Sequence, residues 1–335
     1  MLSKIKRLMS LFLPPPARTF HRQSKLLLDE IRCLQCSVRS GNKELDSKIK
    51  TIGTVLEEIR ALDSKLKALS GKAEDRDKWV NGKLESIDSK LEVKSKVFND
   101  RLDAFDRKAG YLQKTADEIL WANIFNSTTD NSDWLKIKTF SPGRWAAGYP
   151  FLYILYRVLR DVKPKRILEL GLGETTRVIS QYSAEHQEAE HFVVEHDPEW
   201  ISFFTKASPL PGNTKIVQLP WGSVSHKDSE AVRVYEGFSE RFSNGSYDLL
   251  CIDGPLGGDM EQYARIDSLA LVPEHLSSSF TVIVDDYDRI TEQNMVKDLC
   301  EKLDSADIPY AKASYRGMKH AFIACSTDNR FLASL

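Results

Sequence analysis

Two glycines that follow a short apolar run could bring the backbone close to a nucleotide-type ligand. Gly171 and Gly173 stand between the run Arg166 to Leu170 and a helix-compatible segment. Glycine permits a tight turn and a close approach, and the start of a helix presents free backbone N–H groups. Glu195 ends the next apolar run, where its carboxylate could accept both hydroxyls of a ribose. These residues indicate a ligand site at the carboxyl ends of parallel strands.

Two residues at the same turn favour a ligand without phosphate. A dinucleotide site would carry a third glycine where this chain has Thr176, so that a pyrophosphate can reach the helix. Glu169, just before the turn, would repel a pyrophosphate, whereas its carboxylate could bind an ammonium directly or through water. S-adenosylmethionine carries such an ammonium and no phosphate, so these residues favour it over a nicotinamide dinucleotide.

These segments, together with Asp248 to Asp253, resemble the successive motifs of class I S-adenosylmethionine-dependent methyltransferases over about residues 145–326. Shorter pieces resemble methyltransferases of polysaccharide metabolism: Val194 to Trp200, Ile252 to Pro255, and Asp285-Asp286. One departure is Ser277-Ser278-Ser279, where the family often has two glycines before its fifth strand.

The resemblance implies a role for each matched residue. The methionine part of the cofactor would be held by Glu169, Gly171, Gly173 and Thr176. Glu195 would bind the ribose, and His196 would neighbour the adenosine. The implied reaction is methyl transfer to a hydroxyl, or less favourably a carboxylate or phosphate, of a carbohydrate or polysaccharide acceptor.

Three further carboxylates end two strands that are neighbours in the resembled fold. Asp253 ends the fourth strand, whereas Asp285 and Asp286 end the fifth, so the carboxylates should converge at the transfer site. Three uses are open: general base for an acceptor hydroxyl, ligands of a divalent metal that acidifies it, or caps of the following helices. We assign all three residues as catalytic candidates, with metal binding as the alternative.

Other side chains are candidates for contacts with the substrate or cofactor. Tyr263 and Arg265 could bind an acidic glycan, with a surface salt bridge as the alternative for the arginine. Trp200 and Trp221 could stack on adenine or on a sugar, or simply pack in the core.

Alternating apolar runs and helix-compatible segments predict an α/β domain over residues 121–335. The expected fold is a Rossmann-like, seven-stranded methyltransferase sheet preceded by a long α-helical coiled coil. An aromatic-rich helix, Tyr149 to Leu159, should precede the first strand, and a short connection makes the last two strands a hairpin. The predicted strands are Arg166 to Leu170, His191 to Glu195, Lys215 to Leu219, Tyr247 to Ile252, Phe280 to Asp285, Ile308 to Ser314 and His320 to Cys325.

A single seven-residue register of apolar residues predicts a coiled coil over residues 23–112. Polar residues enter the register near 63–77, so we expect a break there. The coil either self-associates or folds back at Gly71, and we predict self-association, which makes the chain a homo-oligomer. The a and d positions hold, among others, Leu45, Ile49, Ile52, Leu56, Ile59, Leu84, Ile87, Leu91 and Phe98.

Residues 1–22 form a basic amphipathic segment with no acidic residue. A helix there would place Leu2, Ile5 and Met9 on one face, and Pro14 would end it. Such a segment could lie on an anionic membrane surface, with a solvated terminus as the alternative. The predicted location is cytoplasmic, peripheral at the inner face of a membrane.

Composition excludes several classes of protein. The chain has 335 residues, 41% hydrophobic, and no apolar stretch long enough to span a bilayer. Residues 1–120 carry 25 Lys and Arg against 18 Asp and Glu, whereas residues 121–335 carry 22 against 30. An acidic second half argues against nucleic acid as a partner. Five cysteines make no disulfide scaffold and indicate a reducing compartment.

The sequence therefore predicts an enzyme that is oligomerised and spaced by its coil, with S-adenosylmethionine as cofactor. The alternative is a coiled-coil scaffold whose Rossmann-like domain binds a nucleotide without catalysis. The set of Glu169, Gly171, Gly173, Glu195 and Asp253 argues against that alternative.

Overall fold

The computed structural model describes residues 17–67, 74–143 and 146–335. The chain divides into two compact units, residues 1–113 and 114–335. The second unit begins at Lys114 and not at the predicted residue 121, because the end of a long helix packs with the α/β domain. Helix α3 spans Glu74–Thr129 and so contributes to both units.

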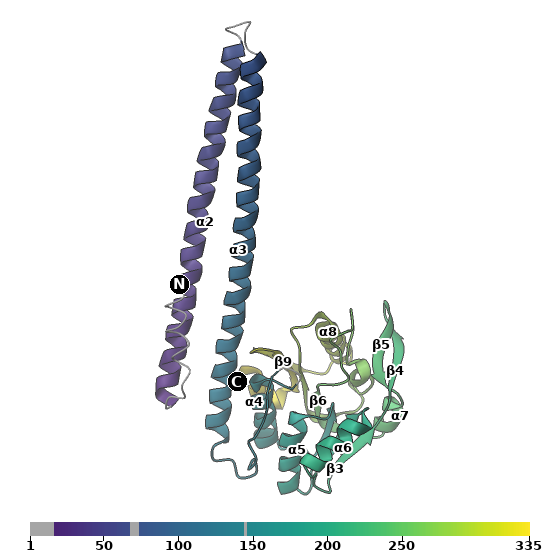
Figure 1. The fold of residues 1–335 in the computed structure, drawn as a ribbon. Coiled ribbons are helices and arrows are strands. Elements are labelled where there is room, and N and C mark those ends of the chain that lie inside the picture. The colour runs from purple at the N-terminus through teal and green to yellow at the C-terminus, as the bar shows by residue number, and fades with distance from the viewer. Residues whose placement is uncertain (1–16, 68–73, 144–145) are drawn as a thin grey trace. The chain divides into compact units, whose positions relative to one another are not determined.

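The first unit is a pair of antiparallel helices, α2 (Ala17–Lys67) and the N-terminal part of α3 (Figure 1). The predicted break near 63–77 coincides with the interval between these helices. The chain folds back on itself, which is the alternative that we did not favour. An ion pair of 3.7 Å joins Arg60 to Asp88 between the two helices, and Leu56 and Leu84 are buried.

The second unit contains a seven-stranded sheet in the order β3-β2-β1-β6-β7-β9-β8. Five adjacent strands pair in parallel, and β9 is antiparallel to both of its neighbours, β7 and β8. This order confirms the predicted Rossmann-like methyltransferase sheet with its terminal hairpin. The strands are β1 (Arg166–Leu170), β2 (Glu190–Glu195), β3 (Thr214–Gln218), β6 (Tyr247–Ile252), β7 (Leu276–Val284), β8 (Tyr310–Arg316) and β9 (His320–Ser326).

Helices cover both faces of the sheet, which gives three layers (Figure 1). One core contains Phe125 of α3, Phe151 of α4 and Val178 of α5, packed on β1, β6 and β7. The other contains Phe238 of α7 and Leu299 of α8, packed on the opposite face. The helices are α4 (Tyr149–Arg157), a π-helical turn (Val158–Val162), α5 (Glu174–Glu185), α6 (Pro198–Ala207), α7 (Phe238–Phe242), α8 (Ile290–Ser305), and the 3-10 segments η2 (Ile266–Ala270) and η3 (Thr327–Ser334).

A separate antiparallel hairpin lies between β3 and β6 and was not predicted. It consists of β4 (Trp221–His226) and β5 (Ser229–Tyr235). Its first strand, Trp-Gly-Ser-Val-Ser-His, has no apolar run because much of it is exposed. The signal that identified the sheet strands is therefore missing there.

No helix among the described residues is long and apolar enough to cross a membrane. The predicted basic amphipathic segment, residues 1–22, lies outside the residues whose side chains the structure describes.

Candidate functional site

The turn after β1 is as tight as its glycines predict. Gly171 has φ +98°, a value that residues with a Cβ rarely adopt. Its amide donates to the carbonyl of Val194 on β2 at 2.9 Å. A Cβ on Gly171 would lie 3.2 Å from the carbonyl carbon of Asp253, so the backbone after β6 passes directly beside the turn. Gly173 precedes the first residue of α5 and leaves its surroundings open.

Glu195 is fixed beside this turn by three backbone donors. Its carboxylate accepts hydrogen bonds from the amides of Leu172 at 3.2 Å, His196 at 2.7 Å and Asp197 at 3.0 Å. The carboxylate thus joins the end of β2 to the glycine turn, which is the place expected for a ribose-binding group.

His196 continues this side of the site. Its Nδ1 lies 2.6 Å from Oε1 of Glu195, and its ring stacks on the indole of Trp221 with centroids 3.6 Å apart. The guanidinium of Arg233 on β5 lies 4.6 Å from the same indole and pairs with Asp259 at 2.7 Å. Hairpin β4–β5 therefore places an aromatic ring and a guanidinium beside His196. Sequence reasoning missed the role of Arg233, because nothing in its neighbourhood resembles a motif.

Glu169 and Thr176 do not face a ligand as predicted. The carboxylate of Glu169 is fully buried; it accepts from the Thr175 hydroxyl and lies 2.8 Å from Nε2 of His191. The buried Thr176 hydroxyl accepts from the amide of Gly173 at 3.0 Å. Both residues shape the turn from within, because β1 directs Glu169 to the face covered by α5. Binding of a cofactor ammonium by Glu169 is therefore corrected to support of the first turn of α5.

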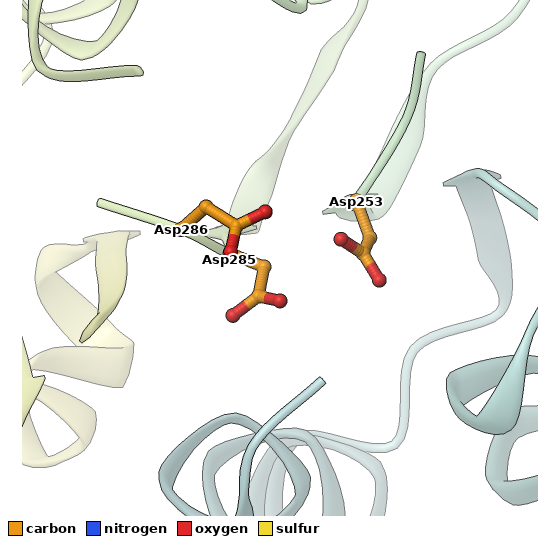
Figure 2. A group of neighbouring side chains, drawn as sticks. All are labelled: Asp253, Asp285 and Asp286. Carbon is orange, nitrogen blue, oxygen red and sulfur yellow. The ribbon is translucent and has the colours of Figure 1, made fainter. Parts of the chain in front are cut away.

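The three aspartates converge as expected (Figure 2). Asp253 follows β6, while Asp285 and Asp286 follow β7, and these strands pair in parallel with Ile252 opposite Val284. One carboxylate oxygen of each aspartate lies within 4.8 Å of the others. Asp286 has φ +58°, a left-handed conformation that is uncommon for non-glycine residues.

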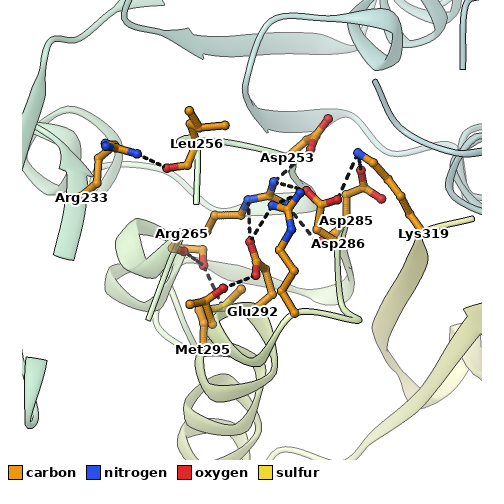
Figure 3. A network of polar contacts seen from close by, with 12 residues as sticks. Arg233, Asp253, Leu256, Arg265, Asp285, Asp286, Glu292, Met295 and Lys319 are labelled. Atoms are coloured by element: carbon orange, nitrogen blue, oxygen red, sulfur yellow. Dashed lines mark hydrogen bonds and ion pairs between the residues drawn. The ribbon is translucent and has the colours of Figure 1, made fainter. Parts of the chain in front are cut away.

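Arg265 lies inside this cluster and not at a surface (Figure 3). Its guanidinium contacts Asp253 at 3.2 Å and Asp286 at 2.7 Å, and it donates to the backbone carbonyl of Asp285 at 2.9 Å. Its Nε also lies 3.5 Å from the buried Glu292 of α8. The prediction that Arg265 binds an acidic glycan is wrong, because the protein's own carboxylates already surround it.

Tyr263 contacts hairpin β4–β5. Its ring packs edge-on against His226 of β4, with centroids 4.7 Å apart. The imidazole of His226 lies 2.9 Å from Asp298 of α8. These contacts fasten hairpin β4–β5 to α8, and the assignment of Tyr263 to substrate binding stays a prediction.

Lys319, at the turn between β8 and β9, is a site residue that sequence reasoning missed. Its ammonium lies 3.0 Å from Oδ2 of Asp285 and 3.1 Å from Oδ1 of Asp286 (Figure 3). Although Lys319 is largely buried, the neighbouring aspartates raise its pKa and keep it charged. No local pattern marks it, because only the hairpin brings it to the ends of β6 and β7.

Burial and charge give the three aspartates different acidities. Burial, together with repulsion from Asp285, raises the pKa of Asp253 well above its usual range. Burial also raises the pKa of Asp285. Burial pushes the pKa of Asp286 in the same direction, but Arg265 and Lys319 outweigh it and hold that pKa below the usual range. These shifts favour a bound proton on Asp253 and Asp285 over Asp286.

The same carboxylates fit a divalent ion in their donor chemistry. Oδ1 of Asp285 is buried and has no hydrogen-bond partner among the described residues. The other oxygens of the pair Asp285 and Asp286 already contact Lys319 or Arg265. An ion would thus be held by Oδ1 of Asp285 together with Asp253, beside cations that already balance part of the negative charge.

No protein-family model and no curated protein matches this sequence. Solved structures resemble the chain. A Podospora anserina methyltransferase with SAH bound is 15% identical, with a TM-score of 0.33, over 66% of this chain and 94% of that one. An O-methyltransferase from Bacillus cereus with SAH is 9% identical, with a TM-score of 0.36, over 63% and 91%. The N-terminal domain of human METTL16 with SAH is 14% identical, with a TM-score of 0.33, over 63% and 81%.

Proposed function

We propose that this chain transfers a methyl group from S-adenosylmethionine to a hydroxyl of a carbohydrate acceptor. The observation that carries the proposal is the packing of the glycine turn against Asp253. The amide of Asp253 donates to the carbonyl of Leu170 at 2.9 Å, and Gly171 contacts the backbone of Asp253. A ligand bound at the turn would thus lie next to the carboxylate cluster.

The charges at the turn favour a cationic ligand over a phosphate. Glu195 binds the amide of Leu172 within the turn, and Asp253 borders the turn on its other side. Carboxylates at both sides attract a sulfonium or an ammonium and repel a pyrophosphate. Gly171 to Gly173 and Glu195 would hold the cofactor, which supplies a methyl group on an activated sulfonium.

The residues of the cluster have separate tasks in this proposal. Asp253 accepts the proton of the acceptor hydroxyl, because its backbone lies directly beside the glycine turn that would hold the cofactor. Arg265 and Lys319 hold Asp285 and Asp286 in place and balance their charge. Positioning of the acceptor supplies much of the rate, since methyl transfer needs an in-line approach.

A carbohydrate acceptor is supported by an exposed aromatic pair on α6. Trp200 and Phe203 stack with centroids 5.5 Å apart, and both are exposed. The indole Nε1 of Trp200 donates to the carbonyl of Leu172 at 2.8 Å, so the pair borders the glycine turn. Flat aromatic rings of this kind can stack on the apolar face of a sugar. Transfer of labelled methyl to polysaccharides should fall in Phe203→Ala while binding of S-adenosylhomocysteine persists, because Phe203 is the member of the pair that is 62% exposed.

Calorimetry of the full chain with S-adenosylhomocysteine and with NAD tests the cofactor. We expect heat with the first ligand only, and a loss of affinity in Glu195→Ala. Glu199→Ala is the matched control, because Glu199 is an exposed carboxylate on the next helix. Absence of heat with S-adenosylhomocysteine, or binding that ignores Glu195, would remove the methyltransferase proposal.

The involvement of a metal is decided by methyl-transfer assays after EDTA treatment. Loss of activity that Mg²⁺ or Mn²⁺ restores would show that a divalent ion is required, for which the three aspartates are the candidate ligands. An unchanged rate would leave Asp253 as the base without an ion.

We also propose that the helical hairpin joins copies of this chain. Ile49, Ile52 and Ile59 occupy a and d positions and remain 36 to 40% exposed within one chain. Burial of these side chains would favour association with a second hairpin. If the hairpin associates but the purified protein transfers no methyl group, the alternative of a scaffold with a non-catalytic nucleotide-binding domain gains support.

We further propose that residues 1–22 dock on anionic membranes, on the basis of their charge and apolar pattern. Flotation with anionic liposomes should be lost when Lys4, Lys6 and Arg7 are replaced by Glu. Equal flotation of the two proteins would contradict it.

A further inference from the structure

Two side chains in the C-terminal part of α3 form hydrogen bonds with the turn between β8 and β9. Trp121 donates through Nε1 to the carbonyl of Arg316 at 2.9 Å. Glu118 accepts through Oε2 from the amide of Met318 at 2.8 Å. Both contacts lie within the second unit and reach the stretch of chain that carries Lys319.

Two backbone amides and two glycines surround the carboxylate of Glu118. Its other oxygen, Oε1, accepts from the amide of Tyr149 at the start of α4, at 2.6 Å. A Cβ on Gly317 would overlap with Oε2, and one on Gly148 would lie 3.1 Å from Oε1. The absence of side chains at both glycines thus leaves room for this carboxylate, which ties α4 and the β8–β9 turn to α3.

The residue that follows Met318 is Lys319, whose ammonium lies between Asp285 and Asp286. The hydrogen bond that the Met318 amide donates to Glu118 therefore fixes the backbone immediately before the lysine. Small displacements at a site of this kind have large effects on rate, because an ammonium that moves by about 1 Å no longer bridges two carboxylates.

We propose that Glu118 is a positioning residue, which holds the β8–β9 turn so that Lys319 bridges Asp285 and Asp286. The inference rests on the proposed methyl transfer for its effect on rate, and on the contacts above for the placement of Lys319. Glu118 touches neither substrate nor cofactor. Its influence passes through Met318 and Lys319.

Kinetics of Glu118→Gln in the full chain test the effect on rate. Glutamine keeps the size of the side chain, but its NH2 group would face one of the two amides, because these donate to separate carboxylate oxygens. We expect kcat to fall about tenfold, a loss typical of residues that orient a functional side chain without touching the substrate. The KM for S-adenosylmethionine should stay unchanged, because Glu195 and Gly171 are not disturbed. Asp106→Asn, at an exposed carboxylate of the same helix, should leave both constants unchanged.

A double variant separates positioning from general stabilisation of the fold. Lys319→Met alone should lower kcat, and Glu118→Gln should lower it no further in that background, because its target is already absent. The proposal would be overturned if the fall in kcat of the double variant equals the product of the two single falls. An unchanged kcat in Glu118→Gln would also overturn it.

Labelling of lysines measures the placement of Lys319 without any methyl transfer. Acetic anhydride should modify Lys319 several-fold faster in Glu118→Gln than in the parent protein, while the exposed Lys297 reacts equally in both. Unchanged labelling of Lys319 would overturn the inference. If the parent protein transfers no methyl group while labelling changes as expected, the proposed function fails and the placement of Lys319 by Glu118 stands.

Discussion

Gly171 and Gly254 face each other so closely that a Cβ on Gly254 would lie 2.9 Å from the amide nitrogen of Gly171. The same Cβ would lie 2.6 Å from the hydroxyl oxygen of Tyr235 on β5. The turn after β1, the turn after β6 and hairpin β4–β5 therefore pack together as one unit. A substitution in any of these three segments should therefore alter the geometry of the glycine turn.

Gly254→Ala should weaken binding of S-adenosylhomocysteine by at least about tenfold, which is about 1.4 kcal/mol. The added methyl would have to displace backbone atoms of Gly171, and these cannot move without opening the turn. Calorimetry on the full chain measures the change. Gly258→Ala is the control, because its Cβ would meet nothing closer than the Arg289 guanidinium at 3.9 Å. Equal affinity in the two variants would show that the turn does not hold the cofactor.

Asp253→Asn should lower kcat by at least about a hundredfold, the usual contribution of a general base. The rate of the parent protein should rise with pH as Asp253 loses its proton, and burial raises this pKa above the usual range of an aspartate. In Asp253→Asn the rate should not show this rise with pH. Initial rates between acidic and neutral pH measure it, with the exposed Asp228→Asn as control. A parallel pH profile in Asp253→Asn would assign the proton to another group.

Asp267→Asn should stabilise the protein at pH 8 relative to pH 5. Burial raises the pKa of Asp267 to about 7, whereas its value in the unfolded chain is near 3.8. The folded state therefore holds a proton that the unfolded state has lost, so the contribution present below pH 4 disappears as the pH rises to about 7. The shift corresponds to about 4 kcal/mol at most.

Urea unfolding at the two pH values measures this effect. Asparagine can still accept from the amide of Tyr235, which donates to Asp267 at 2.8 Å. The difference in unfolding free energy between variant and parent should grow with pH. A difference that does not depend on pH would mean that Asp267 is ionised in the folded protein.

The double variant Ile52→Glu/Ile59→Glu should sediment as a monomer. Both side chains are more than a third exposed within one chain, so the hairpin should retain its helicity, whereas paired negative charges would prevent the seam from closing. Val93→Glu is the control, because Val93 is 61% exposed and lies outside the a and d positions. An unchanged mass for the double variant would place the contact between copies elsewhere.

The elements of the sheet could be predicted because each strand carries its own signal. Six of the seven predicted strands begin within two residues of the observed ones, and β7 begins earlier, at Leu276. Apolar runs bounded by turns report burial on both faces, and that requires no knowledge of the partner strand. Hairpin β4–β5 escaped prediction because β4 is largely exposed and has no such run, and β5 buries only Val232 and Tyr235.

The sequence by itself determined which residues end the central strands, and thereby the glycine turn, Glu195 and the three aspartates. Parallel strands carry their carboxyl ends to one edge, so a local pattern is sufficient to bring these groups together. Only the tertiary structure decided that Glu169 is buried against His191, that Arg265 lies inside the cluster, and that Lys319 reaches it from the last hairpin. These contacts join segments far apart in the chain, and the direction of a side chain depends on which face its neighbours cover. Residue type and spacing alone do not indicate which face of an element its neighbours cover.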